Sequence, residues 1–208
     1  MWQRLTHIDR RWIFLTIALI VATPFIFDWV LPLGSVSPPV RKLYDFIENL
    51  PPHSVVMIAF DYGPGSMPEL QPMAEALARH ALRRKLRLIG MALWPQGTLL
   101  CQQAFTAASA ETGAREGLQW VNLGYKPGGV SVILGMGTDI GQVYHTDHRK
   151  IRLADLPAMS GVRSYEDIGL VIDLAAGVSP GDWVRFAQAR FKQAVAVGCT
   201  AVMAADIY

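Results

Sequence analysis

The chain has 208 residues, of which 51% are hydrophobic and 17% charged, with a formal net charge of +2 at pH 7. This length suits one domain with an appendage. A net charge so near zero gives no indication of nucleic-acid binding, which normally shows as a clustered basic face. Cys101 and Cys199 match no paired zinc or redox spacing, so two buried thiols are expected, with a single disulfide as the alternative.

The N-terminal segment indicates a membrane anchor. Residues 12–27 carry no charge, and the apolar run continues past Asp28. A helix over 12–33 would be about 33 Å long, which exceeds the roughly 30 Å hydrocarbon core of a bilayer. A cleaved signal peptide is the alternative, but the run shows no small-residue cleavage site. We therefore predict an N-terminal tail (1–11), a transmembrane helix in contact with the lipid bilayer (12–33), a linker (34–39) and a domain over 40–208.

Basic residues on either side of this segment suggest an orientation. Arg4, Arg10 and Arg11 precede it, whereas only Arg41 and Lys42 follow closely. The positive-inside rule then predicts a cytoplasmic N-terminus with the domain outside the cytoplasm. Such tethering also makes membrane-protein partners an expectation.

The rest of the chain alternates between apolar runs and helical patterns. Most of the runs are continuous, which is typical of strands buried on both faces of a sheet. Strands are predicted at 54–60, 86–93, 119–123, 130–134, 170–174 and 200–204, although 130–134 could instead open a helix. Helices are predicted at 40–50, 67–85, 99–112 and 182–195. This alternation predicts a three-layer, Rossmann-like α/β domain with a mostly parallel sheet of five or six strands.

The stretch "DYGPGSMPEL", Asp61 to Leu70, follows the first predicted strand. Ligands of open α/β sheets bind outside the carboxyl ends of strands, which makes Asp61 and Tyr62 candidate ligand-binding residues. Ser66 and Glu69 fit a capping box, so part of the stretch has a purely structural interpretation.

Two further strand ends offer candidate ligand contacts. Trp94 in "LWPQG" could provide a flat apolar wall, and Tyr125 in "NLGYKPGG" could do the same. Lys126, with Gly128 and Gly129, could offer an ammonium group and free backbone N–H groups to an anion. A glycine-rich turn with a solvated lysine is the alternative. We predict that the three stretches line one crevice for a small polar or anionic ligand.

Other motifs carry less information. "GMGTDIG" has the wrong spacing for a dinucleotide fingerprint, and no P-loop is present, so no cofactor is predicted. "YHTDHRK" brings together His145, Asp147 and His148, but zinc needs three or four ligands of defined geometry, so we expect a solvated loop and no metal.

Asp173 in "VIDLAAG" resembles Asp61 as an acid near the end of a strand. If the two strands are neighbours, the carboxylates would share a crevice and could perform acid–base chemistry or hold a cation. No nucleophile elbow or H-E-x-x-H motif is present. The leading hypothesis is a non-catalytic, membrane-anchored domain that binds a ligand or serves in a membrane complex. The alternative is a hydrolase or transferase that uses these carboxylates.

"FDYGPGSMPELQPM", "LWPQG", "NLGYKPGG" and "VIDLAAG" together resemble a family of prokaryotic membrane-anchored α/β proteins of unknown function. The resemblance runs from about Pro39 to the end of the chain. It implies no chemistry. It does imply that members continue beyond this point to a second membrane span, so the sequence is expected to be a fragment.

Overall fold

The structure is a computed structural model that describes residues 9–27 and 36–207. The chain divides after Arg41 into two units. In the first unit, helix α1 (Arg10–Ile26) begins after Asp9, whose side chain accepts a hydrogen bond from the Arg11 N–H. None of the side chains of α1 is buried.

The predicted transmembrane helix at 12–33 is not found at that length. Helix α1 has 17 residues, and residues 28–33 of the predicted span lie outside the described part of the chain. Within residues 9–27 and 36–207, no helix is both long enough and apolar enough to cross a membrane. Most of the predicted tail (1–8), the start of the predicted linker (34–35) and Tyr208 are also outside the described residues.

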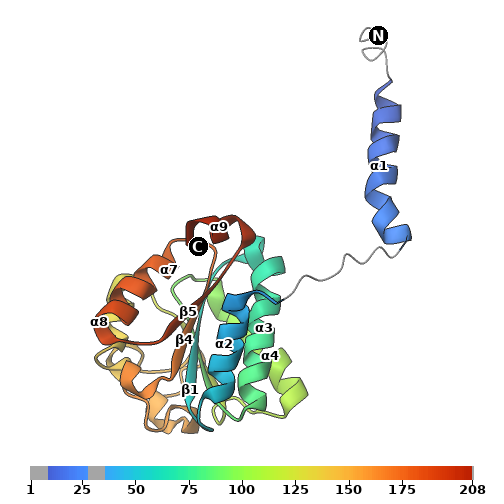
Figure 1. The fold of residues 1–208 in the computed structure, drawn as a ribbon. Coiled ribbons are helices and arrows are strands. Elements are labelled where there is room, and N and C mark those ends of the chain that lie inside the picture. Colours follow the sequence, from blue (N-terminus) through green and yellow to red (C-terminus); the bar gives the residue numbers. More distant parts are fainter. Residues whose placement is uncertain (1–8, 28–35, 208) are drawn as a thin grey trace. The chain divides into compact units, whose positions relative to one another are not determined.

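The second unit is an α/β domain built on five parallel strands (Figure 1). The strands are β1 (Val55–Asp61), β2 (Arg87–Ala92), β3 (Trp120–Tyr125), β4 (Leu170–Ala175) and β5 (Val195–Cys199). Their order is β3-β2-β1-β4-β5, and every neighbouring pair is parallel. This confirms the predicted α/β class and the parallel sheet. The chain reverses its direction of travel across the sheet between β1 and β4, which is the topological switch point.

Helices cover both faces of the sheet. They are α2 (Pro38–Asn49), α3 (Met67–Arg83), α4 (Gly97–Thr112), α5 (Val130–Met136), α6 (Ile140–Val143), α7 (Ser179–Asp182), the π-helical segment η6 (Trp183–Gln188), α8 (Ala189–Phe191) and α9 (Ala201–Ile207). Short 3-10 turns are η2 (Pro64–Ser66), η3 (Leu153–Asp155), η4 (Pro157–Met159) and η5 (Tyr165–Asp167).

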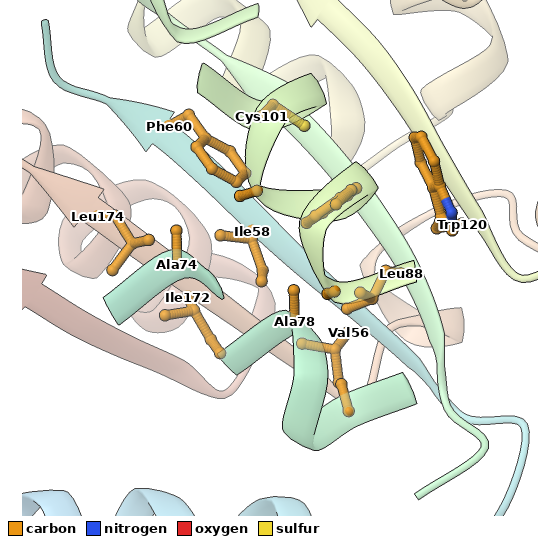
Figure 2. Close-up of a cluster of buried hydrophobic side chains, with 14 of the residues drawn as sticks. Val56, Ile58, Phe60, Ala74, Ala78, Leu88, Cys101, Trp120, Ile172 and Leu174 are labelled. Carbon is orange, nitrogen blue, oxygen red and sulfur yellow. The ribbon is translucent and has the colours of Figure 1, made fainter. Parts of the chain in front are cut away.

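Alternation along β1 separates two hydrophobic cores. Val56, Ile58 and Phe60 face α3 and α4, where they pack with residues such as Ala74 and Cys101 (Figure 2). Val55, Met57 and Ala59 face the opposite side, which is covered by α5, α6, the 3-10 turns and Trp183 of η6. Because side chains alternate along a strand, Asp61 belongs to this second face.

Two predicted strands are wrong. Residues 130–134 form α5 rather than a strand, because the chain turns at Gly128 and Gly129, which have φ of +132° and +49°, directly before them. Residues 201–207 form α9, and the fifth strand is Val195–Cys199, which the sequence pattern had assigned partly to the preceding helix. Short apolar runs of this kind do not distinguish helix from strand by periodicity alone.

The predicted capping box is also wrong. Ser66 makes no side-chain capping bond, and Glu69 instead accepts a hydrogen bond from the Ala201 N–H at 2.9 Å. Cys101 and Cys199 are free thiols, as predicted, but only Cys101 is buried.

Candidate functional site

The predicted site residues fall into separate places at the carboxyl edge of the sheet. Tyr125 and Lys126 line a pocket beyond β3. Asp61 and Asp173 lie side by side on neighbouring strands, buried beneath η6. The structure therefore brings together two pairs of predicted residues, not one common crevice.

The remaining predicted residues have other surroundings. Tyr62 is fully buried among the side chains below α3, where its hydroxyl donates to Gln71 Oε1 at 2.7 Å. Trp94 is partly exposed and packs beside Gly177, the residue that follows β4 by two positions. Gly128 and Gly129 form the turn into α5.

The pocket beyond β3 has a volume of about 370 Å³. This falls in the range of small-molecule sites. Its lining comes from the end of β3, the start of α4 and the loop after α6: Thr98, Leu123, Gly124, Tyr125, Lys126, Tyr144, His145, Thr146, Asp147, His148 and Lys150. The sequence pattern predicts ligand contacts at the end of β3, whereas it predicts that the loop at 144–150 is solvated.

Positive charge dominates the ionisable groups of this lining. Lys126 and Lys150 contribute ammonium groups, and no ion pair to either is found within the described residues. The Lys126 Nζ lies 5.8 Å from the centre of the Tyr144 ring, which is within cation–π range. Among the described residues that line the pocket, Asp147 is the one carboxylate. The pocket therefore favours an anion.

Asp147 has a structural role in its own loop. It is nearly fully buried, and its Oδ1 accepts hydrogen bonds from the backbone N–H groups of Arg149 and Ile151 at 2.9 and 2.8 Å. These bonds hold the turn that carries Lys150, whose φ is +69°. The carboxylate that could have opposed an anion is thus engaged with the backbone.

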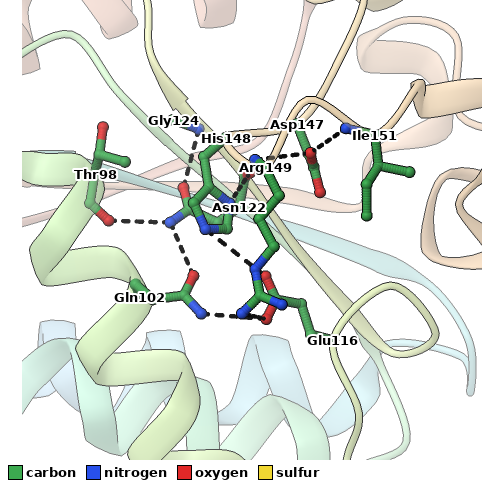
Figure 3. A network of polar contacts seen from close by, with 9 residues as sticks. All are labelled: Thr98, Gln102, Glu116, Asn122, Gly124, Asp147, His148, Arg149 and Ile151. Atoms are coloured by element: carbon green, nitrogen blue, oxygen red, sulfur yellow. Dashed lines mark hydrogen bonds and ion pairs between the residues drawn. The ribbon is translucent and has the colours of Figure 1, made fainter.

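A buried asparagine attaches this loop to the sheet (Figure 3). Asn122 of β3 accepts a hydrogen bond from the Gly124 N–H, and its amide donates to the Thr98 carbonyl at 3.0 Å. Its own carbonyl accepts the His148 N–H at 3.0 Å and contacts His148 Nδ1 at 3.1 Å. Gly124 has a φ of +81°, and a Cβ there would lie 3.2 Å from the His148 Cβ. The loop therefore packs directly on the end of β3.

Glu116 closes the outer side of this network. Its Oε2 pairs with the Arg149 guanidinium at 2.6 Å and accepts from Gln102 Nε2 at 3.2 Å. His148 Nε2 lies 3.9 Å from the other carboxylate oxygen. Within the described residues, no group of three or more His, Cys, Asp or Glu side chains is placed to hold a metal.

The buried carboxyl pair occupies the switch point of the sheet. Asp61 is in register with Ala175 and Asp173 with Ala59, so both carboxyls lie on the same face of β1 and β4, diagonally opposite one another. Both residues have no solvent exposure. Asp61 accepts hydrogen bonds from the Leu93 N–H at 2.7 Å and from Trp183 Nε1 at 3.4 Å. It thereby joins the ends of β1 and β2 to η6.

The carboxyl oxygens of Asp173 receive fewer hydrogen bonds than those of Asp61. Neither of its carboxylate oxygens has a hydrogen-bond partner among the described residues, and the same holds for the buried Ser179 hydroxyl. Burial raises the pKa of Asp61 from 3.8 to about 6, and burial together with the charge of Asp61 raises the pKa of Asp173 well above 3.8. The Ser179 hydroxyl opposes both shifts, which places it beside both carboxyls.

Tyr144 links the two places. It lines the pocket, but its hydroxyl is buried without a hydrogen-bond partner in the described chain. Burial and the nearby charge of Asp61 raise the pKa of its hydroxyl. The sequence pattern missed Tyr144, His145 and Lys150. The polar Asn122 within the apolar run "QWVNL" is the signal that marks the attachment point of their loop.

Comparison with known proteins identified no relative of this chain. No protein-family model matches the chain, and no curated protein or solved structure does either.

Proposed function

We propose that the α/β domain is a non-catalytic binding module that holds a small anionic ligand in the pocket beyond β3. The observation that carries this proposal is the lining: Lys126 and Lys150 face one pocket, and its single carboxylate, Asp147, is engaged by backbone N–H groups. Two ammonium groups that line one pocket attract an anion more strongly than either group does alone.

Binding is favoured over catalysis because of where the acids lie. The enzymatic alternative, a hydrolase or transferase, depends on Asp61 and Asp173 reaching a substrate. Both side chains are fully buried, and neither lines the pocket. Hydrolysis of a simple phosphate ester by the purified full chain, lost in Asp173→Asn, would favour the enzyme instead.

Isothermal titration calorimetry of the full chain with pyrophosphate, and separately with citrate, tests the binding proposal. At least one anion is expected to bind saturably, with an affinity about tenfold lower in Lys126→Gln and in Lys150→Gln, because each substitution removes a charge-assisted hydrogen bond. Affinity should also fall as salt is added.

Lys85→Gln provides a matched control. Lys85 shares the left-handed backbone conformation of Lys150, with φ of +60° against +69°, but lines a different pocket near the start of β2. It should leave affinity unchanged. No saturable binding of either anion, or an equal loss in all three variants, would refute the proposal.

We also propose that α1 contacts a lipid bilayer, with the α/β domain outside the cytoplasm. The supporting observation is that α1 presents large apolar side chains around its surface with none buried, including Trp12, Phe14, Ile20 and Phe25. An apolar helix that is not covered by protein is most stable in lipid.

Two measurements address this second proposal. Alkaline carbonate extraction of membranes from expressing cells should leave the full chain in the pellet, whereas release into the supernatant would indicate attachment through a protein partner. A reporter fused after Pro39 should be active only outside the cytoplasm, and cytoplasmic activity would reverse the orientation.

A further inference from the structure

The Asp61–Asp173 pair is the most unusual group of polar atoms in the domain. Two carboxyls with no solvent exposure sit at the switch point, and no Lys, Arg or His in the described residues forms an ion pair with either. An ionised carboxylate buried without compensation is strongly destabilising. The pair must therefore either hold a proton or be neutralised by a bound cation.

The charge of the pair distinguishes these two states. Asp173 Oδ1, Asp173 Oδ2 and Ser179 Oγ are all buried and have no partner of good geometry in the described chain. One proton shared between the carboxyls, with the Ser179 hydroxyl as a second donor, could satisfy these oxygens but would leave one negative charge buried without a cation. A metal ion next to the carboxyls can accept electron pairs from all three oxygens at once, and its charge of +2 offsets both carboxylates.

We propose that Asp61, Asp173 and the Ser179 hydroxyl form a binding site for one hard divalent cation, Mg²⁺ or Ca²⁺. All the donors are oxygen atoms, which suits these ions and disfavours zinc. Two carboxylates from the protein, with the remaining positions filled by water, is a common arrangement for Mg²⁺. The site is independent of the anion pocket.

The covering element is suited to admitting an ion. Ser179 begins the helix that continues into η6, and Trp183 of η6 donates to Asp61. π-helical segments are rare and occur frequently at functional sites. The preceding Val178 is almost fully exposed, so the first turn of this helix adjoins solvent.

The test is metal binding by the full chain after removal of metals with EDTA. Equilibrium dialysis with elemental analysis is expected to give one Mg²⁺ or Ca²⁺ per chain at cation concentrations up to about 10 mM. This concentration is above the dissociation constants of even weak Ca²⁺ sites in proteins. The cation should raise the thermal midpoint saturably. Asp173→Asn should weaken binding at least tenfold, given that losing even an outer-shell partner costs about 10–100-fold.

Two further variants keep the test decisive. Ser179→Ala removes a single hydroxyl and no charge, so it should fold normally and bind the cation several-fold more weakly. Asp155→Asn alters an exposed acid paired with Arg152 and should bind like the wild type. No stoichiometric binding, or equal binding by the wild type, Ser179→Ala and Asp173→Asn, would overturn the cation site and leave a shared proton as the state of the pair.

Discussion

Asp61 and Asp173 differ in how the fold satisfies them, although both are acids on the same face of neighbouring strands. Asp61 receives two hydrogen bonds, from Leu93 and Trp183, which partly oppose the effect of burial on its pKa. Asp173 receives none among the described residues. Without a cation, the ionised form of the pair is therefore destabilised, and burial together with the charge of Asp61 raises the pKa of Asp173 well above 3.8.

This difference predicts an unusual dependence of stability on pH. Because the folded pKa of Asp61 is raised from 3.8 to about 6, the folded state binds more protons than the unfolded state between these pH values. The free energy of unfolding should then fall as pH rises from 4 towards 7, by about 3 kcal/mol. The raised pKa of Asp173 extends the decline in the free energy of unfolding to higher pH. Urea titrations in the presence of EDTA at several pH values measure this free energy.

Asp173→Asn should make that decline shallower. The substitution removes the Asp173 carboxyl, and with it the share of the decline that the raised pKa of Asp173 contributes. Asp155→Asn, an exposed control, should follow the wild-type curve. Parallel curves for the wild type and Asp173→Asn would mean that the carboxyl pair does not carry the pH dependence.

At the scale of elements, α4 packs unusually close to the sheet. A Cβ on Gly90 of β2 would overlap Cys101 Sγ and lie 2.9 Å from the Phe105 ring. At the start of the same helix, a Cβ on Gly97 would overlap the Phe60 carbonyl. Two glycines, one on each element, thus set the position of α4, and with it the position of Thr98 at the pocket.

Gly90→Ala should lower the free energy of unfolding by about 1–3 kcal/mol, the usual effect of overpacking a core. Combining it with Cys101→Ala should recover part of the loss, because the overlapping sulfur is removed. Gly181→Ala is the control, since a Cβ there meets nothing within 4 Å. Chemical denaturation checks the wild type, these three variants and Cys101→Ala alone. Additive losses in the double variant would contradict this account of the contact.

The end of β3 depends on one buried side chain. Asn122→Ala leaves the Gly124 N–H and the Thr98 carbonyl without their partner, which should cost about 1–3 kcal/mol. Hydrogen exchange by mass spectrometry should show faster exchange at Gly124, whereas the bond from the His148 N–H to the Asn122 backbone carbonyl is retained in this variant. Asn49→Ala, at an exposed amide that donates to Asp45, should not change exchange at Gly124. Unchanged exchange at Gly124 in Asn122→Ala would contradict this role of the Asn122 side chain.

On the scale of the whole molecule, the order β3-β2-β1-β4-β5 places two kinds of polar site along one edge. The carboxyl pair lies at the switch point between β1 and β4, and the pocket lies beyond β3 at the outer end of the sheet. Tyr144 lines the pocket, and the charge of Asp61 contributes to the raised pKa of its hydroxyl.

The sequence was informative about strands and much less so about the site. "SVVMIAF" and "LVIDL" were predicted correctly because continuous apolar runs indicate strands buried on both faces. The pairing of Asp61 with Asp173 depended on β1 and β4 being neighbours, which no local pattern specifies. Tyr62 could not be placed because the next residue after a buried acid alternates to the opposite core.

Only the part of the pocket lining that directly follows β3 could be predicted from the sequence. Lys126 and Tyr125 follow a recognisable strand, so their place at the carboxyl edge could be anticipated. The loop carrying Lys150 comes from a stretch about twenty residues further along the chain. Its contact with β3 arises from the tertiary bonds of Asn122 and His148, which have no sequence signature.

Lysine footprinting tests the anion pocket most directly. The full chain is acetylated briefly with and without saturating pyrophosphate, and mass spectrometry measures the modification of each lysine. The account predicts that pyrophosphate protects Lys126 and Lys150 together, while Lys85 and Lys192, which line other pockets, react at unchanged rates. Protection of Lys85 or Lys192 instead, or of no lysine at all, would contradict it.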